Sequence, residues 1–250
     1  MIFLRKNGDK MRIDDIQRNG YKLIQNPDAF CFGIDAVLLS HYAKVTKQNT
    51  KVLDIGTGNG IVPILMHAIY QKGNYVGIDI QQEVIDLAKQ SVELNNITND
   101  VCMKCVDIKD YKLHFDAEQF DIITCNPPYM KGQSGLKNES TSKMIARHEI
   151  LCTLEDIVSA SAYMLKEKGK LVLIHRAHRL VDILHLMRTY RIEPKRMRMI
   201  YPKVTKAPTM VLVEGIKFAG HELRVDKPLI VYNEDNSYTD EIYEIYGREK

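Results

Sequence analysis

Long apolar runs are missing from this sequence of 250 residues. The longest ones, such as 61–66 and 171–174, are far too short to span a bilayer. The N-terminal residues carry charges where a signal peptide needs an apolar core. A membrane-spanning or exported protein is therefore not expected, and we predict a cytoplasmic protein.

Cysteine is scarce, and its pattern offers no disulfide framework. An odd number of cysteines without an export signal favours reduced thiols. Cys102 and Cys105 form one C-x-x-C pair, but neither a second Cys/His pair at zinc spacing nor a thioredoxin-like context accompanies it. We therefore expect these two thiols to pack in a strand and expect no metal site, with a metal or redox role as the alternative. The five cysteines are Cys31, Cys102, Cys105, Cys125 and Cys152.

Low-complexity tracts, internal repeats and long Gly/Ser linkers are also absent from the sequence. A chain of this length can bury a single α/β core. We predict one domain, with an N-terminal lid (1–49), a cofactor-binding and catalytic core (50–220) and a C-terminal extension (221–250). A monomer is the default expectation.

The net charge is only +3, but basic residues are concentrated in the second half of the chain. Between His175 and Lys206 there are nine Lys or Arg residues and only two acidic residues. A smaller basic surplus runs from Lys131 to Arg147. Such segments favour a polyanionic partner, although a solvated helix face is the simpler alternative for either one.

The first fifty residues predict a short hairpin followed by a helix. Residues 21–25 and 29–32 read as two strands around Asn26-Pro27-Asp28, which are turn-forming residue types. Asp35 precedes the apolar stretch 36–43, so we expect its carboxylate to cap that helix.

After Thr50, short apolar strands alternate with amphipathic helices. This pattern predicts βαβ units and a mostly parallel sheet covered on both faces, with a late antiparallel strand. The expected strands are 51–55, 75–79, 101–106, 120–124, 170–174, 197–201 and 210–218, with a further strand at 229–232. The expected helices are 61–70, 83–95, 154–165 (ending near Gly169), 180–190 and 238–246.

A glycine loop follows the strand 51–55 directly and leads into a helix. Its sequence is Asp54-Ile55-Gly56-Thr57-Gly58-Asn59-Gly60. Glycines allow a tight turn and leave room for a ligand at the carboxyl end of the strand. A lone G-x-G is weak evidence, but here strand, loop and helix coincide.

Asp79 ends the next strand, 19 residues after Gly60. This spacing suits a carboxylate that accepts hydrogen bonds from ribose hydroxyls, so the two features favour a cofactor that contains adenosine. They leave open whether it is NAD or S-adenosylmethionine. However, Ile61-Val62 follow Gly60, and the second half of the dinucleotide fingerprint is therefore missing.

The strand 120–124 leads into the tetrapeptide Asn126-Pro127-Pro128-Tyr129. A conjugated amine is a poor nucleophile, and acceptors such as the Asn126 side chain and the Pro127 carbonyl can orient its N–H groups. Consecutive prolines stiffen the loop, and Tyr129 offers a ring against which a flipped base can stack. The alternative is a proline-rich turn without chemistry.

The glycine loop with its preceding acidic residue resembles the first motif of class I methyltransferases, which have a Rossmann-like fold with a seven-stranded sheet. Together with the tetrapeptide, it resembles the amino-methyltransferases that act on adenine N6, guanine N2 or glutamine. This resemblance implies S-adenosyl-L-methionine as cofactor, with Asp54 near its methionine amino group, Gly56, Gly58 and Gly60 beneath it, Asp79 at the ribose, Asp107 at the adenine amine, Ile80 and Ile108 around the adenine ring, and Asn126 beside it. For Asp107, a loop or helix-capping role is the alternative.

Residues 25–39, 146–149, 195–198 and 201–202 make the resemblance narrower, because they are similar to the bacterial tRNA1(Val) adenine-N6-methyltransferases over nearly the whole chain. That family modifies the adenine 3′ of the anticodon, so the resemblance implies tRNA as partner. A methyltransferase for rRNA guanine or protein glutamine, or a nucleotide-binding module without chemistry, are the alternatives. The implied lid residues are Phe32 and Asp35, and the expected RNA-binding residues are Lys131, Arg147, His148, Arg176, Arg179, Arg196 and Arg198, although Arg147 and His148 would otherwise read as a helix-end salt-bridge pair.

Overall fold

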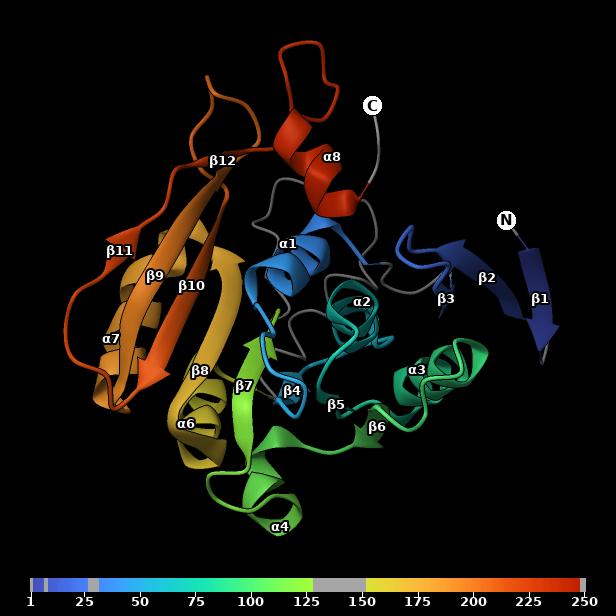
Figure 1. Ribbon diagram of the computed structural model, residues 1–250, viewed down its shortest axis with the longest axis horizontal. Coiled ribbons are helices and arrows are strands. Elements are labelled where there is room, and N and C mark those ends of the chain that lie inside the picture. Colours follow the sequence, from blue (N-terminus) through green and yellow to red (C-terminus); the bar gives the residue numbers. More distant parts are fainter. Residues whose placement is uncertain (1, 7–8, 27–31, 128–151, 248–250) are drawn as a thin grey trace.

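The computed structural model describes residues 2–6, 9–26, 32–127 and 152–247, and its centre is one large sheet (Figure 1). The expected β-strands at 51–55 and 120–124 are present, as β4 and β7. From one edge to the other the main strands follow the order β6, β5, β4, β7, β8, β10, β9. Their bounds are β4 (Lys51–Ile55), β5 (Asn74–Asp79), β6 (Val101–Cys105), β7 (Phe120–Cys125), β8 (Leu165–Arg176), β9 (Ile192–Tyr201) and β10 (Met210–Lys217).

The sheet is mostly parallel, as the sequence predicted. β5 pairs in parallel with β4 and β6, and β7 pairs in parallel with β4 and β8, whereas β10 runs antiparallel to both β8 and β9. Two short strands pair with β9 in addition to the seven main strands. β12 (Leu229–Ile230) is a shorter form of the further strand expected at 229–232, and β11 (Arg224–Val225) was not expected. The carboxyl ends of β4 to β9 therefore lie at one edge of the sheet, where ligands bind in open α/β folds.

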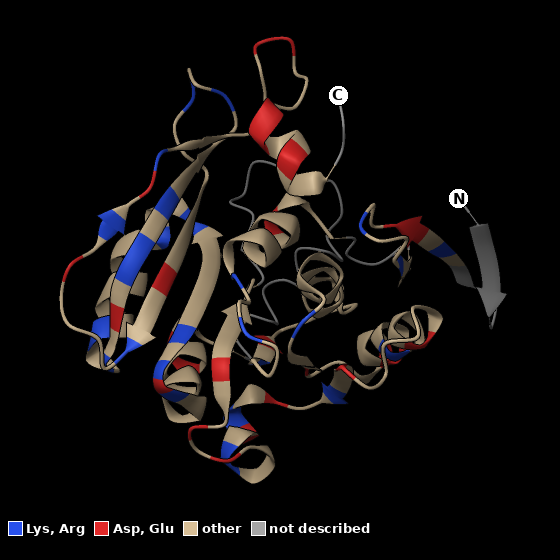
Figure 2. Ribbon diagram, viewed as in Figure 1, with Lys and Arg blue, Asp and Glu red and all other residues tan. Residues whose placement is uncertain are grey.

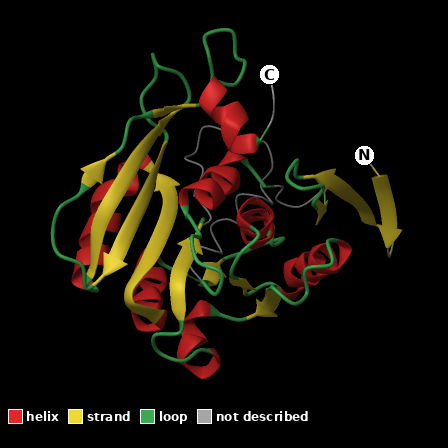
Figure 3. Cartoon of the chain, viewed as in Figure 1, coloured by secondary structure: helices red, strands yellow, loops and turns green. Residues whose placement is uncertain are grey.

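Helices cover both faces of this sheet (Figure 3). Adjacent strand residues point to opposite faces, so Val52 packs with α1 (Ile34–Tyr42), α2 (Ile61–Tyr70) and α3 (Gln82–Leu94), whereas Leu53 packs with α6 (Leu154–Met164) and α7 (Leu180–Thr189). The short helices η1 (Ile108–Asp110), α4 (Tyr111–His114) and η2 (Ala177–Arg179) complete the connections. No helix among the described residues is both long and apolar enough to cross a membrane.

The expected boundary between α6 and its following strand is wrong. Thr153 and Asp156 form a reciprocal capping box that starts α6, but the helix ends at Met164 and β8 begins immediately at Leu165. Gly169 is therefore inside the strand and does not end the helix. A Cβ at Gly169 would lie 2.9 Å from the Lys166 carbonyl oxygen, so close backbone approach explains this glycine.

The N-terminal strands include two that the sequence analysis did not predict, and the predicted hairpin of 21–25 with 29–32 falls largely outside the described residues and stays a prediction. β3 (Lys22–Gln25) pairs with β2 (Asp9–Asp15), which pairs with β1 (Ile2–Lys6), and the expected partner 29–32 is described only at Phe32. β3 is fastened to α3, because the Ile24 N–H donates to the Ser91 hydroxyl at 2.9 Å. This small sheet therefore attaches to the helix layer beside α3 (Figure 1).

The helix α1 begins with an N-cap two residues earlier than predicted. Gly33 is the N-cap residue, and Asp35 lies within the first turn, where it accepts the Ala36 N–H at 3.1 Å. An acidic residue in this turn still suits the helix dipole. The N-terminal segment also contacts α8 (Asp240–Tyr246), because the Arg18 guanidinium donates to the carbonyls of Glu244 and Ile245.

Candidate cofactor and target-amine site

The glycine loop joins β4 to α2 through three left-handed residues. Gly56, Gly58 and Gly60 have φ angles of 70°, 55° and 82°, which residues with a Cβ rarely adopt. A Cβ at Gly56 or Gly58 would meet nothing within 4 Å, whereas one at Gly60 would lie 2.7 Å from the Met103 side chain. Gly56 and Gly58 therefore leave open space above the loop, while Gly60 is required for packing of the loop onto β6.

Asp54 is buried just before this loop, at the end of β4. One carboxylate oxygen accepts the Thr124 hydroxyl at 2.7 Å, and the other has no hydrogen-bond partner among the described residues. Burial raises the pKa of Asp54 to about 7, and the hydroxyls of Thr124 and Thr57 oppose this shift. A cationic amine brought to this side chain would supply the missing partner, so Asp54 fits the expected methionine amino group.

Asp79 at the end of β5 is hydrogen-bonded to the glycine loop. Its Oδ2 accepts the Gly58 N–H at 3.0 Å, and its Oδ1 accepts the Gln81 N–H at 3.0 Å. A carboxylate has about four acceptor sites, so both oxygens keep capacity for ribose hydroxyls. Asp79 is only partly buried, and the residues present thus fit an adenosine-bearing cofactor.

The expected adenine contacts lie where β5 and β6 end side by side. The Val106 N–H donates to the Asp79 carbonyl at 2.9 Å, which places Asp107 near the ribose acceptor. Asp107 accepts the Lys109 N–H at 2.9 Å and so caps η1. Ile80 is 39% exposed and can face a ring, but Ile108 is only 6% exposed and packs in the core.

Asn126 and Pro127 follow β7 directly beside the glycine loop. The strand register aligns Asp54 with Thr124 and Ile55 with Cys125, so the residues after each strand meet at one edge. Asn126 is partly buried and Pro127 is buried. Pro128, Tyr129, Lys131, Arg147 and His148 lie outside the described residues, and their roles stay predictions.

The segment before α1 reaches the loop through Gln25, whose role the sequence analysis missed. The buried Gln25 side-chain oxygen accepts from the Asn59 amide at 3.2 Å and from the Phe32 N–H at 3.1 Å. Phe32 and Ile61, the first residue of α2, line a small pocket of about 50 Å³. Gln25 thus brings the Phe32 backbone near Asn59 of the glycine loop, and the lid role of Phe32 stays a prediction. In the sequence, Gln25 is only a glutamine at the end of an expected strand, and this alone does not predict a contact with the glycine loop.

Gly77 and Thr57 form a second contact that sequence reasoning missed. A Cβ on Gly77 would lie 2.7 Å from the Thr57 hydroxyl and 2.6 Å from the Met103 sulfur. The Thr57 N–H also donates to the Ile78 carbonyl at 2.9 Å. The glycine loop therefore packs against β5 at a position where only a glycine fits. Gly77 supports the loop from the side of the sheet, away from the open space above Gly56 and Gly58.

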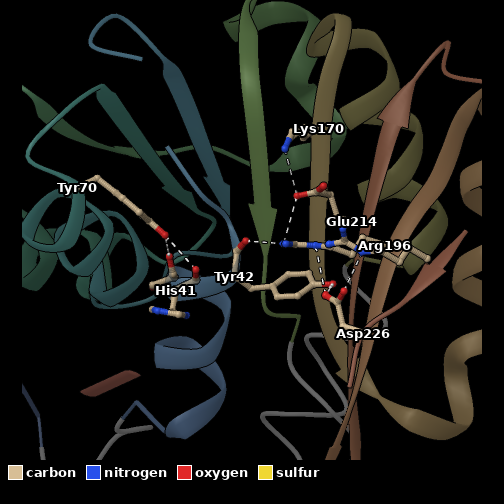
Figure 4. Close-up of polar contacts among 9 residues, drawn as sticks. His41, Tyr42, Tyr70, Lys170, Arg196, Glu214 and Asp226 are labelled. Atoms are coloured by element: carbon tan, nitrogen blue, oxygen red, sulfur yellow. Dashed lines mark hydrogen bonds and ion pairs between the residues drawn. The ribbon is translucent and has the colours of Figure 1, made fainter. Parts of the chain in front are cut away.

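Arg196 on β9 lies in an internal ionic cluster and not on an open basic surface (Figure 4). Its guanidinium lies 3.6 Å from Glu214 and 3.7 Å from Asp226, donates to the Tyr42 carbonyl at 2.9 Å, and stacks 3.8 Å over the Tyr42 ring. Figure 2 shows the basic residues of β9 beside an acidic position of β10. These contacts give Arg196 a structural role.

Arg198 also has partners within the fold. It pairs with Glu241 of α8 at 2.7 Å and donates to the Lys227 carbonyl at 2.8 Å. The predicted RNA contacts at Arg196 and Arg198 therefore compete with bonds that hold the C-terminal segment, and replacing both residues is no clean test of RNA binding. By contrast, Arg176 is the last residue of β8 and Arg179 ends η2, so both lie at the carboxyl edge of the sheet.

The C-x-x-C pair does not pack as expected. Cys102 and Cys105 lie on the edge strand β6, as predicted, but both side chains are exposed. Within the described ranges, no three His, Cys, Asp or Glu side chains are grouped so that they could hold a metal ion.

Comparison with known proteins identifies the class. The family model described as "Methyltransferase domain" matches residues 46–210, and the chain belongs to this family. The family match and the glycine-loop site together support S-adenosyl-L-methionine as the cofactor. The chain is a methyltransferase that depends on this cofactor.

The relatives and one solved structure add detail. A tRNA1(Val) (adenine(37)-N6)-methyltransferase from Porphyromonas gingivalis is 27% identical over 199 residues, covering 78% of this chain and 77% of the relative. One of the same name from Cytophaga hutchinsonii is 27% identical, with 84% and 87% covered. The crystal structure of a predicted O-methyltransferase from Agrobacterium tumefaciens shares the fold, with a TM-score of 0.69, 20% identity, and 85% and 95% covered.

Proposed function

We propose that this chain transfers a methyl group from S-adenosyl-L-methionine to the N6 amine of an adenine in tRNA, in the anticodon loop. The observation that carries the proposal is the position of Asn126-Pro127, which the register of β4 and β7 sets beside the glycine loop. The names of the curated relatives support the choice of tRNA and of adenine N6.

The chemistry required of the chain is orientation of a weak nucleophile. S-adenosyl-L-methionine supplies an electrophilic methyl group on a sulfonium. The Asn126 side-chain oxygen and the Pro127 carbonyl accept the two N–H groups of the adenine amine, which favours a geometry with its lone pair aimed at the methyl group. The ammonium formed by transfer is acidic and loses a proton to water, so no general base is needed.

Binding and catalysis are divided between different residues of the same edge. Asp54 and Asp79 hold the cofactor at its amino and ribose groups, and Gly56 and Gly58 leave space for it. Asn126 acts on the target amine. This division predicts that cofactor affinity and turnover respond to different substitutions.

The test is transfer of labelled methyl groups to three candidate substrates. The purified chain is incubated with labelled S-adenosyl-L-methionine and, separately, bulk tRNA, ribosomes or a release factor. We expect label in tRNA, and mass spectrometry of digested tRNA should find N6-methyladenosine in the anticodon loop. Label only in rRNA or on a protein glutamine would show that the proposed substrate is wrong.

A further inference from the structure

A second pocket opens beside Pro127, at the edge of the sheet where the proposed chemistry takes place. Its volume is about 190 Å³. This is below the roughly 300–1,000 Å³ of pockets that hold drug-sized ligands, so the pocket suits one planar group the size of a base better than a whole cofactor. It is lined by Pro127, Cys152, Thr153, Leu154, Ile157, His175 and Arg179.

One wall of this pocket is apolar, and the polar groups in its interior are neutral. Ile157 and Leu154 belong to the core cluster that covers one face of the sheet. The buried His175 accepts the Arg176 N–H on its Nδ1 at 2.8 Å, so its proton is on Nε2. Burial lowers the pKa of His175 to about 4 and raises the pKa of the Cys152 thiol to about 12. The interior therefore suits an uncharged planar group.

Among these seven lining residues, only Arg179 is charged at neutral pH. Its Nε donates to Asp182 at 2.7 Å, and the two side chains are 34% and 55% exposed. An ion pair this exposed contributes little to stability. A guanidinium carries five N–H donors in a planar fork, so it can bind a phosphate while it keeps its contact with Asp182.

The cations of the neighbouring connection lie at the same edge. Met210, the first residue of β10, pairs with both Arg176 and Ile200, so the loop between β9 and β10 begins and ends near the end of β8. This loop carries Lys203 and Lys206. The Ala177 N–H donates to the Thr209 carbonyl at 3.2 Å, which joins the loop to η2. Phosphates that adjoin the pocket would thus meet further positive charge.

We propose that this pocket receives the target nucleotide of the RNA substrate, with the base against Pro127 and Ile157 and a phosphate bound by Arg179. The inference rests on the proposed function, because it specifies how the RNA is held at that site. An apolar wall with neutral polar groups suits a base, and a cation among them suits its phosphate. Arg179 is then a binding residue that positions the nucleotide for Asn126.

Arg188 provides a control on α7, the helix that directly follows Arg179. It lies near the carboxyl end of α7 and pairs with Glu193 at 2.8 Å. Glu193 is near the start of β9, at the opposite edge of the sheet from Asn126. Arg179→Ala and Arg188→Ala therefore remove the same charge at opposite edges. The Glu193 side chain is only 11% exposed and that of Asp182 is 55% exposed, so the unfolding free energy of both variants is measured alongside.

The experiment compares the KM for tRNA, kcat and the salt dependence of tRNA binding in these two variants. Arg179→Ala should raise the KM for tRNA about tenfold, because a charge-assisted hydrogen bond is lost. It should also lower the slope of log affinity against log salt by about one. Arg188→Ala should change neither, and both variants should bind S-adenosylhomocysteine normally. Arg179→Lys should recover part of the affinity.

A second variant tests the interior of the pocket. Cys152→Leu adds volume without charge, so it should lower kcat/KM for tRNA and leave affinity for S-adenosylhomocysteine unchanged. If wild-type protein methylates tRNA and Arg179→Ala behaves like Arg188→Ala, this inference is wrong while the proposed function stands. If wild-type protein labels only a protein, the proposed function fails first, and the inference falls with it.

Discussion

Asp54 and Arg196 are both ionisable side chains inside the fold, but their surroundings differ. Arg196 lies among two carboxylates, a backbone carbonyl and an aromatic ring, and its Nε is 3.7 Å from Asp226 without a hydrogen bond among the described residues. Asp54 has one hydroxyl contact at 2.7 Å and one oxygen without a partner among the described residues. A buried charged group with counter-charges in the chain stabilises the fold. One without them indicates a site where a ligand supplies the counter-charge.

Removing Arg196 should produce the largest loss of stability. Arg196→Met takes one cation away from Glu214 and from Asp226, which keep Lys170 at 3.4 Å and Arg224 at 3.0 Å. It also removes the donor to the Tyr42 carbonyl, and we expect a loss of about 3 kcal/mol of unfolding free energy. Chemical denaturation measures this loss, with Lys195→Ala on the same strand as the control, because Lys195 contacts only exposed carbonyls among the described residues. Normal stability in Arg196→Met would contradict a structural role for Arg196.

Asp54 should make the protein less stable as the pH rises. Below pH about 4 its carboxyl is protonated in both the folded and unfolded states. Its folded pKa is raised to about 7, so the stability advantage of the proton is lost progressively between pH about 4 and 7, by up to about 4 kcal/mol.

Asp54→Asn should remove this pH-dependent part and weaken binding of S-adenosylhomocysteine. Denaturation curves at several pH values measure the first effect, and calorimetry measures the second. Asp86→Asn, an exposed position on α3, is the control. Identical pH profiles in wild type and Asp54→Asn would contradict an uncompensated carboxylate at this site.

Asn126→Ala separates turnover from cofactor binding within the site. Loss of one aligned acceptor typically costs about 10²–10³ in rate, and we expect this loss in turnover with nearly unchanged cofactor affinity. Single-turnover methylation and calorimetry with S-adenosylhomocysteine separate the two. Near-normal turnover would mean that the tetrapeptide is only a structural turn.

Asp79→Ala should have the smallest effect of the four substitutions. It removes acceptors for the ribose and for the Gly58 N–H, and a hydrogen bond to a charged group is worth about 1.5–3 kcal/mol. Affinity for S-adenosylhomocysteine should fall at least tenfold, with Asp110→Ala as the control. Unchanged affinity would place the ribose elsewhere, and comparable binding of NAD by wild type would contradict the cofactor assignment.

The sequence predicted the elements around the glycine loop better than the charged contacts of β9. Strand, loop and helix from Lys51 to Tyr70 have the bounds that the pattern indicated, because alternation, glycines and apolar periodicity are local signals. Errors appeared where local signals conflict with packing. Gly169 reads as a helix end but is inside β8, and Asp35 reads as a cap but lies in the first turn.

The sequence by itself determined the order of the strands in the chain, the glycine loop, Asp79 and the position of Asn126 after its strand. All of these depend on residues close together in the chain, where spacing sets geometry. Only the tertiary structure decided which charges have partners. Arg198 meets Glu241 from 43 residues away, and Asp54 meets Thr124 from 70. No local pattern encodes such pairs, because they depend on how the sheet brings distant strands and helices together.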